Sequence, residues 1–321
     1  MSLEWQARSN PVAWWWGLLA LVSIANIAFW FLLYGEFHKD PTGSLGSAGT
    51  GVMFLLSAAY VFGCAFRSFL PRADVQRICL FDTWLSSVLV GRSVATVAEV
   101  CFAAQWAIIL ARLGEMTGAD TTLNASLVVV PLIVIAQCCS WYGVLTTNYL
   151  ANAIENSIWA VAFLVVGIGL CRLLPEFNGP VRVALIIAIT GIAGYLAFLV
   201  TIDVPMYLSR WQAGLADGSR SLGFLEGLRD ASTRWVVTHD LAEWKDEIPW
   251  MSLYFSAAVW ASLALCVVYS LDLPRYRTEP AAATWSACAR SHSSGTGCSL
   301  ASWSIDSFAS RSVNGNRTIT S

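Results

Sequence analysis

Charged side chains are scarce in this chain. Only 12% of its 321 residues are Asp, Glu, Lys or Arg, and the 19 Lys and Arg nearly balance the 21 Asp and Glu. No basic run is present that could neutralise a phosphate backbone, because the Lys and Arg residues are spread along the whole chain. We therefore exclude nucleic acid as a main partner.

Residues that hold cofactors are also scarce. The chain has three histidines and two lysines, and all five lie outside the apolar stretches: His38, His239, His292, Lys39 and Lys245. A bis-histidine haem, an intramembrane zinc hydrolase and a retinal Schiff base each need such a side chain within a span. We therefore expect no cofactor and no metal ion within the apolar part of the chain.

Motifs of soluble catalysis are missing as well. The sequence contains no phosphate-binding loop, no Gly-rich dinucleotide fingerprint and no GxSxG elbow. Its nine cysteines include no CxxC pair, so they indicate neither a zinc knuckle nor a disulfide framework. An enzyme is therefore not the favoured interpretation.

Apolar residues are abundant instead, at 56% of the chain, with a mean hydropathy of +0.59. A bilayer core of ~30 Å needs ~20 apolar residues of helix. Seven stretches qualify: 12–34, 51–69, 85–113, 123–145, 154–174, 181–204 and 251–271. The sequence predicts an all-α fold, a polytopic membrane bundle of about seven transmembrane helices whose main partner is the lipid bilayer.

The remaining segments divide the chain into parts. A short N-terminal segment, 1–11, precedes a transmembrane domain at 12–274, and residues 275–321 form a Ser-rich segment that we expect to be a disordered tail. The connection 205–249 is expected to form interfacial helices on the membrane, because tryptophans border it at positions 211, 235, 244 and 250. A protein partner would use this connection or the tail.

Arginines set the expected orientation. With seven spans, nine Lys and Arg residues fall on the side of the N-terminus and six on the opposite side, the distal tail excluded. The bias is strongest after the second span, at Arg67, Arg72 and Arg77. The positive-inside rule then predicts a cytoplasmic N-terminus, in a membrane that the sequence does not identify.

Two ionisable residues within the third span are the strongest functional signal. Arg92 and Glu99 are seven residues apart, which places them on one helix face about two turns from each other. Ionisable groups inside a span are costly and mark functional sites by default. The alternative is that Arg92 reaches the interface and pairs with Asp82 or a lipid phosphate.

A second group of polar residues lies at the border of the fourth and fifth spans. Asn148, Asn152 and Glu155 follow a helical spacing, and Asp203 ends the sixth span. In the expected topology these residues share the cytoplasmic half with Arg92 and Glu99. They predict a polar pocket, although the stripe from Asn148 is also compatible with a solvated turn.

Other polar residues have simpler interpretations. Gln137, in the middle of the fourth span, is expected to hold helices together through an interhelical hydrogen bond. His239 and Glu243 have the spacing of metal ligands on a helix, but Asp240 with Glu243 resembles a helix N-cap. We therefore predict no metal site there.

The function that these patterns favour is non-enzymatic. A small polar or amphipathic ligand would be bound or transported in the cytoplasmic-half pocket lined by six residues: Arg92, Glu99, Asn148, Asn152, Glu155 and Asp203. Two alternatives stay open. One is a lipid-modifying enzyme with Glu99 or Asp203 as general base, and the other is a membrane scaffold or assembly factor.

Overall fold

The computed structural model describes residues 10–39, 48–218 and 220–278. Within these residues the chain is an all-α bundle, as the sequence predicts. Seven of its helices are long and apolar enough to cross a membrane, which is compatible with a multi-pass membrane protein. Most of the predicted N-terminal segment and of the predicted tail lies outside the described residues.

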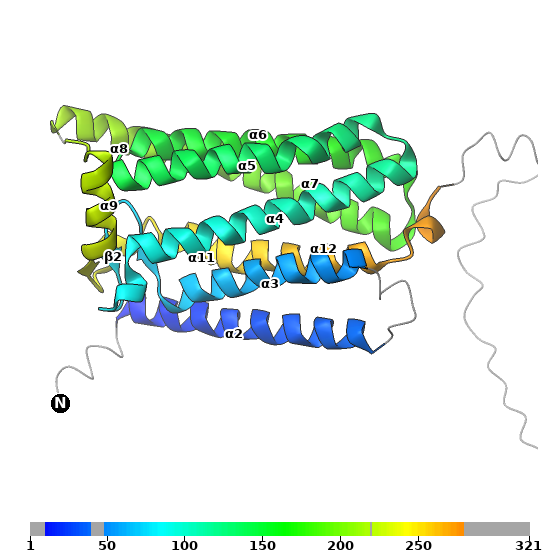
Figure 1. Ribbon diagram of the computed structural model, residues 1–321, viewed down its shortest axis with the longest axis horizontal. Helices are drawn as coiled ribbons and strands as arrows, with labels where there is room; N and C mark the ends of the chain where they lie inside the picture. Colours follow the sequence, from blue (N-terminus) through cyan, green and yellow to red (C-terminus); the bar gives the residue numbers. More distant parts are fainter. Residues whose placement is uncertain (1–9, 40–47, 219, 279–321) are drawn as a thin grey trace, which may run out of the picture. The chain divides into compact units, whose positions relative to one another are not determined.

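The long helices lie along one another in Figure 1. They are α2 (Pro11–His38), α3 (Ala48–Phe69), α4 (Val88–Thr117), α5 (Asp120–Thr146), α6 (Tyr149–Leu173) and α7 (Gly179–Phe198), together with the last span, Ile248–Ser270. Shorter helices are α8 (Val204–Ala216), α9 (Phe224–Thr233) and α10 (Leu241–Trp244), and the last span contains α11 (Ile248–Leu253) and α12 (Val259–Ser270). The 3-10 turns are η2 (Trp84–Ser86), η3 (Leu174–Glu176) and η6 (Leu273–Tyr276), and two π-helical segments are η4 (Leu199–Asp203) and η5 (Tyr254–Ala258).

Local sequence explains where the central helices begin and end. Ser87 caps α4 by accepting a hydrogen bond from the Val90 N–H, and Gly118, with φ of 70°, ends it. Thr147, with φ of 56°, ends α5, and the Asn148 side chain then caps α6 by accepting from the Leu150 N–H. A two-residue turn therefore joins α5 to α6, where the sequence left the boundary open.

Pro205 does not end a helix, contrary to the sequence prediction of a span ending at residue 204. The chain passes from α7 through η4 into α8 without a break. The Val204 N–H donates to the Leu199 carbonyl, five residues back, so the hydrogen-bond register widens directly before the proline. A second wide turn, η5, joins α11 to α12 in the last span.

One end of the bundle carries most of the connecting structure, and we call it the α9 end. There α9 lies crosswise to the long helices (Figure 1). The strands β1 (Arg72–Ala73) and β2 (Ile78–Cys79) pair antiparallel, and β3 (Val236–Val237) adds in parallel to β2. The connection 205–249 is thus joined to the segment after α3 by a small sheet that the sequence analysis did not predict.

Trp244 shows that this connection is packed against the bundle. Its side chain is fully buried beside Trp15, with ring centroids 5.7 Å apart. Its indole N–H donates to the Thr238 carbonyl at 3.0 Å. Trp244 is therefore a core residue, whereas the sequence analysis grouped it with interfacial tryptophans.

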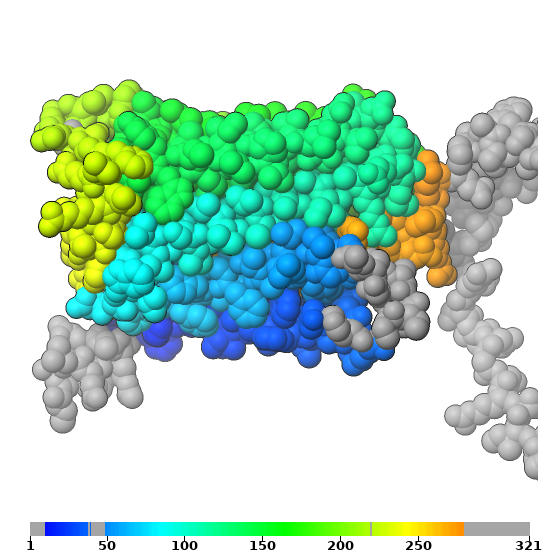
Figure 2. Space-filling view, in the orientation of Figure 1, coloured from blue at the N-terminus to red at the C-terminus, as the bar shows by residue number. Residues whose placement is uncertain are grey.

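The face drawn in Figure 2 is formed by α2, α3, α4, α5 and α6, which lie side by side from dark blue to green. Behind them the buried core joins α4 to α6 through large apolar side chains. Its members include Phe102, Leu110, Trp159, Val166 and Leu170.

Candidate functional site

A cavity of about 1010 Å³ lies between α3, α4, α6, α7, η4, η5 and α12. On α4 it extends from Arg92 to Leu113, which is ~30 Å at 1.5 Å of rise per residue. The lining is polar near the α9 end and apolar along the rest. The ionisable residues on it are Arg67, Asp74, Arg92, Glu99, Glu155, Asp203, Tyr195, Tyr207, Tyr254, Glu247 and Cys64.

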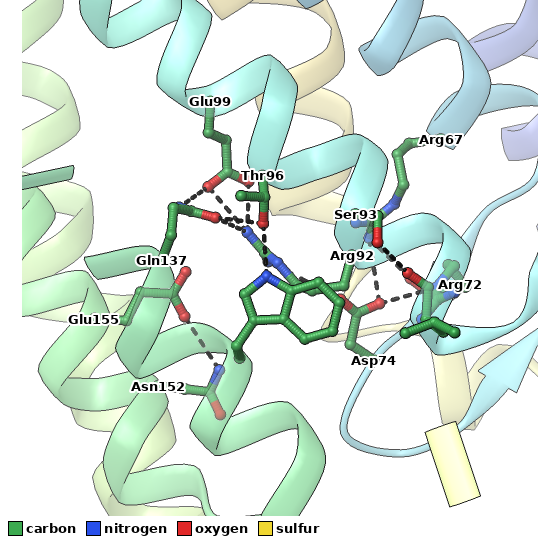
Figure 3. A network of polar contacts seen from close by, with 12 residues as sticks. Arg67, Arg72, Asp74, Arg92, Ser93, Thr96, Glu99, Gln137, Asn152 and Glu155 are labelled. Atoms are coloured by element: carbon green, nitrogen blue, oxygen red, sulfur yellow. Dashed lines mark hydrogen bonds and ion pairs between the residues drawn. The ribbon is translucent and has the colours of Figure 1, made fainter. Parts of the chain in front are cut away.

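Arg92 and Glu99 form the central pair of the polar section (Figure 3). The Arg92 Nη2 lies 3.0 Å from Glu99 Oε2, and both side chains are buried. Gln137 of α5 bridges them, since its Oε1 accepts from Arg92 at 2.7 Å and its Nε2 donates to Glu99. The structure therefore places Arg92 inside the bundle and not at Asp82, whose carboxylate accepts from the Trp235 indole.

Gln137 is itself held in place by two further residues. The Thr96 hydroxyl donates to Gln137 Oε1 at 3.0 Å, and the Trp141 indole donates to the Thr96 oxygen at 3.0 Å. Gln137 thus forms the interhelical hydrogen bonds that the sequence predicts for it. The network fixes the orientation of Arg92 between α4 and α5.

Asp74, which the sequence analysis did not single out, forms ion pairs with three guanidinium groups. Its carboxylate lies 2.9 Å from Arg72 Nε, 3.6 Å from Arg67 Nη2 and 4.0 Å from Arg92 Nη1. Burial raises the pKa of the Asp74 carboxyl, but Arg72, Arg67 and Arg92 outweigh it and hold that pKa well below its usual range. Burial also lowers the pKa of Arg72 to about 10, although Asp74 opposes the shift.

Glu155 and Asp203 have neutral partners instead. The Asn152 amide donates to Glu155 Oε2 at 3.2 Å, and the Asn156 amide donates to Asp203 Oδ2. Among the described residues, no basic side chain lies within 4.0 Å of either carboxylate. Both side chains are buried and both line the cavity.

Glu247 completes the polar section from the last span. It accepts hydrogen bonds from Gln76 at 2.8 Å, from the Trp250 indole at 2.7 Å and from Arg210 at 3.3 Å. These bonds connect α8 and α11 to the segment after α3. Groups that are far apart in the sequence are therefore bonded to one another at the α9 end of the polar section.

Aromatic rings form the wall next to the polar section. Trp159 stacks on Phe163 at 5.7 Å, and Phe163 meets the edge of Tyr195 at 5.2 Å. Trp106 reaches the same wall, with its ring centroid 6.2 Å from that of Phe163. Its buried indole N–H has no hydrogen-bond partner among the described residues.

The cavity is open on one side of the bundle, between α7 and the last span. Lining residues on both helices are exposed: Ile187, Gly191 and Gly194 on one side, and Leu253, Ala257, Trp260 and Ala264 on the other. Ile187 is 67% exposed and Trp260 is 43% exposed. These positions belong to helices that are long and apolar enough to cross a membrane.

Five of the six residues predicted from the sequence line this cavity: Arg92, Glu99, Asn152, Glu155 and Asp203. Asn148 does not, because its side chain caps α6. Sequence reasoning missed Asp74, Glu247 and Arg67, which lie in or beside the connections. The one available signal was that Asp74 lies among Arg67, Arg72 and Arg77 after the second span, but these arginines served for the orientation alone.

The predicted N-cap is present at α10, where the Asp240 side chain accepts from the Ala242 N–H at 2.9 Å.

Comparisons of the chain with protein-family models, with curated proteins and with solved structures found no match. The function is therefore argued from the cavity itself.

Proposed function

We propose that the protein binds an amphipathic ligand from the surrounding bilayer, with the ligand's polar head among the buried charges and its apolar part along the aromatic wall. One observation carries this proposal: a single cavity joins buried ionisable groups to a long apolar section. Ligand pockets typically measure ~300 to 1,000 Å³ and combine apolar walls with few polar groups, and this cavity of about 1010 Å³ fits that description.

The opening between α7 and the last span supports a ligand that arrives from the membrane. A water-soluble ligand would have to cross the α9 end, where Arg210, Gln76 and Trp250 are all bonded to Glu247. An amphiphile dissolved in the bilayer meets the exposed apolar residues of the opening first. Its head can then reach the polar section without separating these bonded side chains.

A fluorescent probe tests the proposal. The protein is reconstituted in nanodiscs and titrated with a single-chain amphiphile whose conjugated polyene accepts energy from tryptophan. Trp106 and Trp159 line the cavity and act as donors. We expect energy transfer that saturates with probe concentration. Ala188→Phe should weaken the affinity for the probe about tenfold, because this change fills the apolar section of the cavity.

Ala28→Phe is the matched control, since Ala28 is exposed on α2 and does not line the cavity. Equal transfer in wild type and Ala188→Phe would contradict binding in the cavity. The same probe separates the alternatives, with sealed proteoliposomes replacing nanodiscs for the transport measurement. A probe that is recovered chemically altered would favour a lipid-modifying enzyme, accumulation across a sealed vesicle would favour transport, and no saturable binding would favour a scaffold.

We also infer that the α9 end faces the cytoplasm, from the excess of arginine on that side of the spans. Ser221 at the α9 end and Thr121 at the other end are both exposed. In a background without exposed native cysteines, Thr121→Cys should react with an impermeant thiol reagent in intact cells, and Ser221→Cys should react after the membrane is opened. The reverse result would invert the orientation.

A further inference from the structure

The charges that surround the polar section do not balance. Five carboxylates line the cavity: Asp74, Glu99, Glu155, Asp203 and Glu247. Among the described residues, four guanidinium groups lie within 4.0 Å of them, those of Arg67, Arg72, Arg92 and Arg210. With all nine groups ionised, this set therefore carries a net charge of −1, and two of its carboxylates have no guanidinium group within 4.0 Å.

This excess is located at two side chains. The guanidinium groups bond to Asp74, Glu99 and Glu247, whereas within the described part of the chain Glu155 and Asp203 accept hydrogen bonds from the neutral amides of Asn152 and Asn156. A buried carboxylate without a positive partner carries a large desolvation cost, which a cationic ligand removes. Asp246 does not add to the imbalance inside, because its side chain is 52% exposed.

The aromatic wall begins directly beside these carboxylates. Trp159 follows Glu155 by one helical turn on α6, and Tyr195 precedes Asp203 by about two turns. Both rings line the cavity. Ring faces attract ammonium groups, so an ammonium bound near these carboxylates would also meet aromatic rings.

Trp106 provides an observation that is independent of the acidic groups. Its indole N–H is buried at the cavity wall without a partner in the described chain, although a buried donor normally has one. It lies at the level of Phe163, eight residues beyond Glu155, or ~12 Å along the helix. An oxygen on the apolar part of a ligand would satisfy it.

We infer that the ligand of the proposed binding site is a single-chain amphiphile with one ammonium head, seated between Glu155 and Asp203, with an acceptor oxygen on its chain near Trp106. This inference rests on the proposed function, since it specifies the chemistry of the same cavity. It gives the excess negative charge a partner and the free indole donor an acceptor.

Competition with the polyene probe tests the head group. The competitors are octadecylamine, octadecanoate and octadecanol, which share one chain, measured in nanodiscs of uncharged net composition at neutral pH. We expect the amine to displace the probe at least about tenfold more strongly than the acid. The double variant Glu155→Gln with Asp203→Asn should lose this preference and still bind the alcohol, which shows that it is folded.

Asp246→Asn is the matched control, because it removes one negative charge from the same end without changing the cavity lining. It should keep the preference for the amine. If acid and amine compete equally, and Ala188→Phe weakens both, the ammonium head is overturned while the binding function stands. If Ala188→Phe changes the competition by none of the three compounds, the proposed function itself is contradicted.

The same assay also tests the proposed acceptor oxygen on the ligand's apolar chain. An amine with an ether oxygen ~12 Å from its nitrogen should bind several-fold more tightly than octadecylamine, as this distance corresponds to eight residues of helix. Trp106→Phe, which keeps an aromatic ring and removes the N–H, should abolish that gain alone. An equal gain in Trp106→Phe would overturn the role of the indole donor.

Discussion

Arg92 and Glu99 lie two helical turns apart on α4, and Arg92 Nη2 lies 3.0 Å from Glu99 Oε2. The side-chain amide of Gln137, on α5, forms hydrogen bonds to both. The pair is buried, so it differs from a surface ion pair, whose loss has little effect. Breaking a buried pair leaves a charge without a partner.

Arg92→Ala should therefore lower the free energy of unfolding by ~3 to 5 kcal/mol, the usual cost of such a break. The double variant Arg92→Ala with Glu99→Gln should recover part of that loss, since the second change removes the stranded carboxylate. Unfolding in mixed detergent micelles measures both. Arg182→Ala, at an exposed position on α7, is the control and should stay close to wild type; a similar loss there would show that the effect is not specific to the pair.

Gly227 sets how closely α9 approaches the bundle. A Cβ at this position would overlap the Leu145 carbonyl oxygen, which is backbone and cannot rotate away. Gly227→Ala should destabilise the protein by ~1 to 3 kcal/mol and speed hydrogen exchange in α9. Gly223→Ala is its match, because the nearest atom there is 3.8 Å away on a flexible side chain. Unchanged exchange in Gly227→Ala would mean that α9 does not dock this way.

The depressed pKa of Asp74 predicts that the protein loses stability as the pH falls into the acid range. The Asp74 pKa is depressed in the folded state, so its contribution is fully present above the unfolded value of ~3.9 and is lost as the pH falls toward the folded pKa. Thermal unfolding followed from neutral pH down to pH ~3 should show this loss. Asp74→Asn should be less stable at neutral pH and flatter below pH ~4, whereas Asp246→Asn should keep the wild-type slope.

Gly191 tests the opening toward the bilayer. A Cβ added there meets no atom within 4 Å, so Gly191→Trp should fold normally while its ring obstructs the passage between α7 and the last span. Probe loading from donor vesicles should slow several-fold. Gly17→Trp adds the same ring at an open position on α2, away from the cavity, and should load at the wild-type rate. Equal rates in both variants would count against this route.

The sequence predicted the spans because length and apolarity decide whether a helix can cross a bilayer. It also placed Arg92 and Glu99 on one face, since a spacing of seven fixes their direction on any α-helix. It did not separate Asn148 from Asn152: both fit a helical stripe, but the turn at Thr147 makes Asn148 a cap. Whether the six predicted residues bind a ligand stays a prediction.

Other features depend on contacts between distant segments, which spacing does not reveal. Asp74 joins the site because its connection folds back under α4, where Arg72 and Arg92 meet it. Three of the arginines used for the orientation, Arg67, Arg72 and Arg77, are buried, so they stabilise the fold as well as adding to the positive-inside bias. Pro205 was mistaken for a helix end because no sequence pattern indicates the π-helical segment that precedes it.

The wide turns η4 and η5 have a consequence for how the lengths of these helices can vary. Removing one residue from an ordinary α-helix rotates everything beyond it by ~100°, which exchanges lipid-facing and inward-facing side chains. A π turn already contains one residue more than an α turn, so a deletion within Leu199–Asp203 or Tyr254–Ala258 restores α-geometry and leaves the flanking faces aligned. In a scan of single-residue deletions through the spans, these two segments should be the tolerant positions.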